Sequence, residues 1–90
     1  MARVLIKGTQ ITVPNTVGAG TSFSEATLVR LVNTATGTDR VVTVQETAGG
    51  TTVGSFTMPG NTVEFVEKKS TEAIFAAANT VLGSSVGYTN

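Results

Sequence analysis

The chain contains no cysteine, no histidine and no tryptophan among its 90 residues. Without cysteine there is no disulfide, and without cysteine and histidine the usual zinc sites are excluded. The Ser–His–Asp arrangement of hydrolases is excluded too, because no histidine can act as the base. A domain of this size buries a limited share of its surface, so association with further subunits is a common source of additional stability.

Charge is also scarce. Six basic and six acidic residues cancel, and charged residues make up only 13% of the chain. A nucleic-acid-binding protein needs an excess of basic residues to neutralise phosphates, so we expect no nucleic-acid partner. A neutral, weakly charged surface opposes self-association poorly and is more typical of a protein held in an assembly.

Long apolar runs are missing. Near the N-terminus the run of residues 4–6 ends at Lys7. A secretory signal needs about 7–15 apolar residues, and a membrane span needs about 20. We therefore expect a soluble chain that is made in the cytosol and binds no membrane.

Threonine, valine and ten glycines dominate instead. β-branched residues favour strands, and glycine favours the turns between them. About seven short strands at this spacing predict an all-β fold, a single small β-sandwich of Ig-like or jelly-roll-like type. The strands are expected within residues 3–7, 10–13, 26–33, 40–47, 51–58, 62–68 and 81–88.

The first 24 residues are less regular than the rest, and Pro14 ends the short strand before it. We interpret residues 1–24 as an N-terminal arm with the first strands and residues 25–90 as the sandwich, within one domain. Residues 26–33 carry apolar side chains on both faces, which predicts a strand that is covered on both sides. The second sheet is expected to cover one face and a neighbouring subunit the other.

The sequence predicts the conformation of two turns. A three-residue loop of residues 48–50, with Gly50 in the left-handed position, places Val42 opposite Phe56 and Arg40 beside Met58. A two-residue loop would instead split the apolar side chains between the two faces. Residues 59–60, Pro-Gly, suit the centre of a type II turn, with a positive φ at the glycine.

One segment stays ambiguous. Ser70 can cap a single helical turn near residues 71–78, with residues 73–78 as its body. The alternative is a strand edge that holds Ile74 and Phe75, followed by an alanine-rich loop. Three phenylalanines in apolar patterns are predicted to lie in the core: Phe56, Phe65 and Phe75.

Catalytic groups are not apparent. A serine–lysine pair would need one of the lysines, Lys7, Lys68 or Lys69, and all three sit among polar residues that predict a solvated position. Glu64 and Glu67 are three residues apart, so they point to opposite faces of a strand and do not converge on one bond. We therefore expect no enzyme, no catalytic residue, no metal and no cofactor.

Five segments carry a resemblance to a known family. They are VRLVN (29–33), VVTV (41–44), GSFTMPG (54–60), VEFVEK (63–68) and VGYTN (86–90). Over residues 26–90 the chain resembles small virion structural proteins of marine tailed phages, especially those that infect cyanobacteria. The resemblance implies a decoration or cement protein that binds the outer surface of the major capsid protein and stabilises the shell. It also implies a homo-oligomer, commonly a trimer, and an N-terminal arm that reaches a neighbour.

A protein interface is expected at Arg3, Leu5 and Lys7 of this arm and at Tyr88, whose amphipathic ring suits an interface. Two other functions compete with capsid decoration. One is a structural component of the tail, neck or baseplate with the same fold. The other is a carbohydrate-binding module for host attachment, although no tryptophan is present to stack on a sugar ring.

Overall fold

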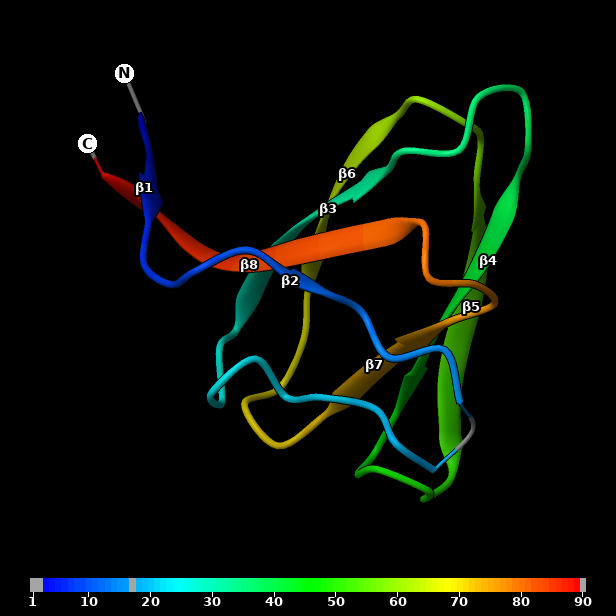
Figure 1. The fold of residues 1–90 in the computed structure, drawn as a ribbon. Coiled ribbons are helices and arrows are strands. Elements are labelled where there is room, and N and C mark those ends of the chain that lie inside the picture. Colours follow the sequence, from blue (N-terminus) through cyan, green and yellow to red (C-terminus); the bar gives the residue numbers. More distant parts are fainter. Residues whose placement is uncertain (1–2, 17, 90) are drawn as a thin grey trace.

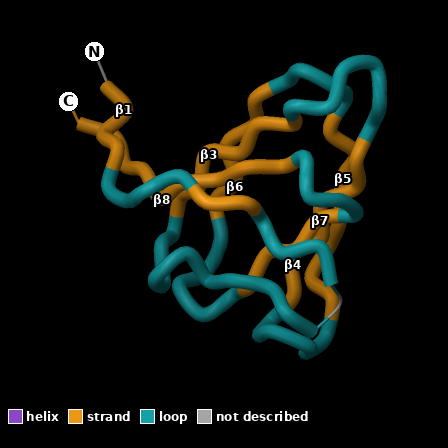
Figure 2. Tube along the Cα trace, in the orientation of Figure 1, coloured by secondary structure: helices purple, strands orange, loops and turns teal. Residues whose placement is uncertain are grey.

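The computed structural model describes residues 3–16 and 18–89 and shows a small all-β sandwich. No helix occurs among these residues, as Figure 2 shows. The strands number eight, where about seven were expected. Their bounds are β1 (Arg3–Ile6), β2 (Ile11–Thr12), β3 (Leu28–Asn33), β4 (Arg40–Gln45), β5 (Thr52–Met58), β6 (Val63–Glu67), β7 (Ala73–Ala76) and β8 (Val81–Thr89).

The strands form two antiparallel sheets. The larger sheet has the order β1-β8-β3-β6, and β2 also pairs with β8. The smaller sheet has the order β5-β4-β7. Among the described residues, β6 therefore ends the larger sheet on one side, and β5 ends the smaller sheet on one side.

The longest strand, β8, organises the larger sheet. One of its edges pairs first with β2 and then with β1, and the other pairs with β3. The ladder with β3 ends at Ser85, whereas the ladder with β1 continues to Thr89. Beyond Ser85, β1 and the end of β8 thus form a two-stranded ribbon, which projects from the sandwich to the left in Figure 1. We call this element the terminal ribbon.

The core lies between the two sheets. Alternation along β3 directs Val29 and Leu31 inward, and neither side chain is exposed. The facing sheet contributes Val42, Met58 and Ile74, which are equally buried. Contacts of this kind between two inner faces supply most of the stability of a small sandwich.

Residues 11–24 also contribute to this core, through the buried side chains of Val13 and Phe23. Phe23, Ser24 and Glu25 have positive φ angles of 54°, 56° and 61°. Three consecutive non-glycine residues in this region form a left-handed turn, which is rare because Cβ crowds the backbone. Side chains hold the turn: Thr21 Oγ1 accepts from Phe23 N–H (3.1 Å) and Ser22 Oγ from Glu25 N–H (3.2 Å). Residues 11–24 therefore pack against the sandwich, whereas β1 pairs with the end of β8 in the terminal ribbon.

Buried Asn33 joins four segments at one end of the sandwich. Its Nδ2 donates to the carbonyl oxygens of Met58 (2.9 Å) and Thr38 (3.0 Å). Its Oδ1 accepts from Ala35 N–H (3.1 Å) and Thr80 Oγ1 (3.2 Å). Every hydrogen-bonding group of this amide is satisfied, so its burial costs little and fixes the loops that surround it.

The predicted register of β4 and β5 is confirmed, because Val42 lies opposite Phe56 and Arg40 opposite Met58. The predicted loop is wrong. The register shifts by one residue after Val44, and this bulge lets the hairpin close through residues 47–50. Gly49, rather than Gly50, takes the positive φ of 77°.

The predicted type II turn is also wrong, because the positive φ of 59° belongs to Asn61 and not to Gly60. Asparagine tolerates this conformation. Gly60 is required for a different reason: a Cβ there would lie 2.8 Å from the backbone nitrogen of Gly37. The glycine thus permits the turn at residues 35–38 to approach closely.

The ambiguous segment forms a strand, so a helical turn near 71–78 is excluded. β7 pairs with β4 on one side, and on the other side Ile74 exchanges two backbone hydrogen bonds with Thr21 (2.9 and 3.0 Å). Alternation buries Ile74 and Ala76 against the core. These tertiary contacts outweigh the helix propensity of the alanines, since a helix of so few residues is unstable alone.

Candidate protein-binding surfaces

The structure brings the predicted interface residues together on the terminal ribbon. Arg3 pairs with Thr89, and Leu5 pairs with Gly87. Tyr88 pairs with Val4, and Lys7 follows directly, with its N–H bonded to Ser85 O (2.9 Å). The side chains of Arg3 and Tyr88 lie outside what the structure describes. Leu5 and Lys7 are exposed.

A second surface was anticipated from the apolar residues on both faces of β3. The outer face of the larger sheet consists of three cross-strand rows, defined by the registers of β8, β3 and β6. We call this surface the outer face. Its rows are Leu82–Val32–Val63, Ser84–Arg30–Phe65 and Leu28–Glu67.

Exposure on the outer face rises toward its edge strand. Val32 and Leu82 are half-buried. Val63 and Phe65 on β6 are 45% and 39% exposed. The core prediction for Phe65 is therefore wrong, while Phe56 is half-buried against the core and Phe75 is half-buried outside it. Within residues 3–16 and 18–89, β3 is the one strand that pairs with β6, so the apolar side chains of β6 lie beside an open strand edge, which favours contact with another protein.

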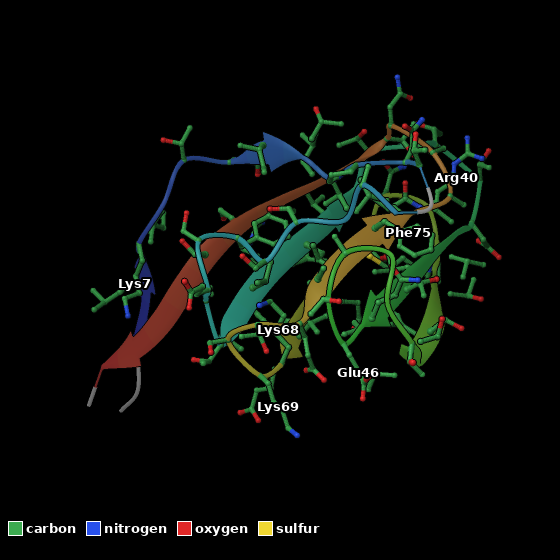
Figure 3. All side chains as sticks on the ribbon, turned by 90° about the horizontal axis from the view of Figure 1, so that it is seen from below. Lys7, Arg40, Glu46, Lys68, Lys69 and Phe75 are labelled. Carbon is green, nitrogen blue, oxygen red and sulfur yellow. The ribbon has the colours of Figure 1, made fainter. Side chains whose placement is uncertain are left out.

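A cleft of about 670 Å³ lies where the terminal ribbon leaves the sandwich. Val86 and Gly87 of β8 line it, as do Thr27 and Leu28 at the start of β3. All three lysines of the chain reach the cleft, together with Glu67 and Glu72. We call it the lysine cleft. Figure 3 labels the lysines, with Lys7 beside the terminal ribbon and the other two on the turn after β6.

The predicted solvated position of Lys68 is wrong, because its side chain is only 8% exposed. Its Nζ donates to the carbonyl oxygens of Lys69 (3.3 Å) and Ser70 (3.4 Å), and both distances exceed the usual range for such bonds. Burial lowers the pKa of Lys68 below its usual 10.5, against the opposing effect of the carboxylates of Glu72 and Glu25. The ammonium is thus partly desolvated, and its two hydrogen bonds are long.

The acidic residues of the lysine cleft differ in how they are engaged. Glu72 Oε1 accepts from Lys69 N–H (2.7 Å), while Glu72 N–H donates to Lys69 O (3.0 Å). This reciprocal pair closes the turn after β6. Glu67 is exposed at the end of β6, and Glu64 is exposed as well.

Across 3–16 and 18–89, no three acidic, histidine or cysteine side chains are grouped so that they could hold a metal ion. The described part of the chain also has no helix of the length and hydropathy needed to cross a bilayer.

Sequence reasoning missed the lysine cleft. Adjacent Lys68 and Lys69 look like an ordinary solvated strand end, and Lys7 is far away in the sequence. A weak signal existed in the alternation of β6, because Val66 and Lys68 share a face and Val66 packs against the core.

Comparison with known proteins adds no identity: no protein-family model, no curated protein and no solved structure matches the chain.

Proposed function

We propose that the chain is a non-enzymatic structural protein of a tailed-phage particle, which binds the outer surface of the major capsid protein and stabilises the shell. The observation that carries this proposal is the outer face, where Val63 and Phe65 present apolar side chains beside an open strand edge. The resemblance of residues 26–90 to phage virion proteins supports the choice of partner.

The physical argument concerns burial rather than chemistry. Apolar area removed from water contributes about 25 cal/mol per Å², and a half-exposed row across three strands offers such area without a large desolvation penalty. Arg30 and Glu67 are the only charged residues in the three rows. Many symmetric copies on one shell add their contributions, so a modest affinity at each site suffices.

The direct test is a cryo-EM map of the particle combined with the copy number of the chain in purified virions. We expect density for the chain on the capsid surface, with copies in proportion to the capsid protein. A location on the tail, neck or baseplate, with few copies, would replace capsid decoration by the first alternative. Binding to a glycan array through Phe65 would favour the carbohydrate-binding alternative.

A pair of matched variants tests the surface itself. Val63→Glu places a charge on the outer face, whereas Val53→Glu places one at a 56% exposed position on the edge strand of the other sheet. Both variants should fold, since neither side chain is buried. We expect Val63→Glu to lose binding to particles stripped of the protein and Val53→Glu to retain it. Equal binding of the two variants would contradict a role for the outer face.

A further inference from the structure

The root of the terminal ribbon leaves part of β8 with a strand partner on one side only. Its ladder with β1 extends to Thr89, but its ladder with β3 ends where Ser85 lies opposite Val29. Backbone groups alternate in direction along an antiparallel strand. Some N–H and C=O groups of residues 87–89 therefore face the side that β3 has left, where no ladder partner is found among the described residues.

The lysine cleft lies along this same edge, because Gly87 and Thr27 both line it. Its volume of about 670 Å³ falls within the range of about 300–1,000 Å³ that is typical of ligand pockets. Gly87 also lets the side chain of Lys7 lie against this part of β8, since a Cβ there would lie 3.2 Å from Cδ of Lys7. The cleft thus joins an unpaired strand edge to a space of suitable size.

The charges indicate what the cleft would accept. Lys68 lines the cleft with a side chain that is only 8% exposed, and its ammonium makes two long hydrogen bonds, so one of its three donors has no partner among the described atoms. Glu72 is occupied by the turn that it closes, and the hydrogen bonds of Lys68 go to carbonyl oxygens and not to the nearby carboxylates of Glu25 and Glu67. A carboxylate from outside would form a charge-assisted bond with Lys68 and offset the cost of its burial.

We propose that the lysine cleft binds an extended segment of a partner protein, which adds to β8 as a strand beside residues 87–89 and places a carboxylate side chain against Lys68. This mode is strand addition, in which backbone hydrogen bonds give affinity and a side-chain contact gives specificity. Leu28 and Glu67 border both the lysine cleft and the outer face, but the contact with Lys68 does not require the partner to be a capsid protein.

The test uses the full chain, labelled with ¹⁵N, and three synthetic peptides of alternating threonine and valine. The first peptide has one central glutamate, the second has glutamine at that position, and the third keeps the glutamate but has proline beside it. We expect the glutamate peptide to shift the amide resonances of residues 86–89 and 68–70. The glutamine peptide should bind several-fold more weakly, and the proline peptide should not bind, because proline blocks strand pairing.

Variants separate the carboxylate contact from general attraction. Lys68→Met should abolish the preference for glutamate over glutamine, while Lys69→Met, at an exposed position of the same cleft, should preserve most of it. Thermal unfolding of each variant establishes that it is folded. Equal binding of the glutamate and glutamine peptides to the wild type would overturn the proposal. So would an unchanged preference in folded Lys68→Met, or equal binding of the proline peptide.

Discussion

The ring of Phe23 occupies the space that a side chain at position 83 would fill. A Cβ on Gly83 would lie 2.8 Å from Cζ and 2.9 Å from Cε1 of Phe23, and 2.9 Å from Cδ2 of Leu31. The left-handed turn at residues 23–25 is what brings the ring to this place on β8. An unusual backbone conformation and an unusually small residue in a central strand are therefore two parts of one packing arrangement.

Gly83→Ala should destabilise the protein by about 1–3 kcal/mol, the usual cost of overpacking a core. Urea unfolding measures this change. Gly54→Ala is the matched control, because position 54 is also in a strand, yet nothing lies within 4 Å of the Cβ that it would gain. Its effect should be close to zero or slightly stabilising. Similar losses in both variants would contradict the packing of Phe23 on Gly83.

Ser24→Gly should stabilise the protein, since its φ of 56° is strained for serine and unstrained for glycine. The expected gain is at most about 1 kcal/mol, because glycine also adds entropy to the unfolded chain. Ser55→Gly, at an exposed position of β5, should have the opposite sign. Melting temperatures of the two variants decide the matter: a loss of stability in Ser24→Gly would rule out strain at this turn.

Asn33→Asp should cost about 2–5 kcal/mol at neutral pH. The substitution removes the two N–H donors and sets a buried carboxylate against the carbonyl oxygens of Met58 and Thr38. Asn61→Asp provides the control at an exposed position. Chemical denaturation of both variants provides the comparison, and a mild effect of Asn33→Asp would show that the four segments are held by other contacts.

Lys68 predicts a pH dependence of stability. Burial makes its pKa lower in the folded chain than the usual 10.5 of the unfolded chain. At a pH between the folded-state and unfolded-state pKa values of Lys68, the unfolded chain binds more protons than the folded chain. The free energy of unfolding therefore rises with pH in this range. At a pH below both pKa values, the cost of burying the charged lysine does not change with pH. Lys68→Met should lack this rise. Urea unfolding from neutral pH to pH 10.5 tests it; parallel profiles for the two proteins would contradict it.

Deletion of residues 2–10 should leave a folded sandwich with a reduced melting temperature. The deletion removes β1 and its ladder with β8 but retains Val13, which is fully buried. If β1 forms part of the capsid interface, particle occupancy should also fall. Ile6→Thr is a milder change than the deletion. The side chain of Ile6 is 79% exposed, so its replacement by threonine leaves β1 paired with β8. Undiminished occupancy after the deletion would remove β1 from the interface.

Much of the fold could be predicted because the alternation of apolar and polar residues along each strand shows which side chains face the core. Val42 and Phe56 fixed the register of β4 and β5, since a shift of one residue would have placed them on opposite faces. The loop between these strands was not predictable, because the bulge after Val44 depends on the three-dimensional course of the ladder. For the same reason, the pairing of β7 with β4 and with Thr21 could not be foreseen from an alanine-rich segment.

The candidate surfaces were predictable to different degrees. The outer face could be predicted, because β3 has apolar residues on both of its faces and the second sheet covers one of them. The lysine cleft does not, because it joins Lys7 to a turn some sixty residues away. Local sequence describes each lysine as solvated, and only the departure of β3 from β8 creates the space in which Lys68 is buried.

The terminal ribbon also determines how the molecule would respond to force. Arg3 and Thr89 are paired at its tip, so tension that draws these two residues apart would load the β1–β8 ladder from one end. Hydrogen bonds strained in this geometry break in sequence rather than together, and the ribbon would unzip at low force. On the other side of Ser85, β8 is also held by β2 and β3, so the terminal ribbon would open before the sandwich does.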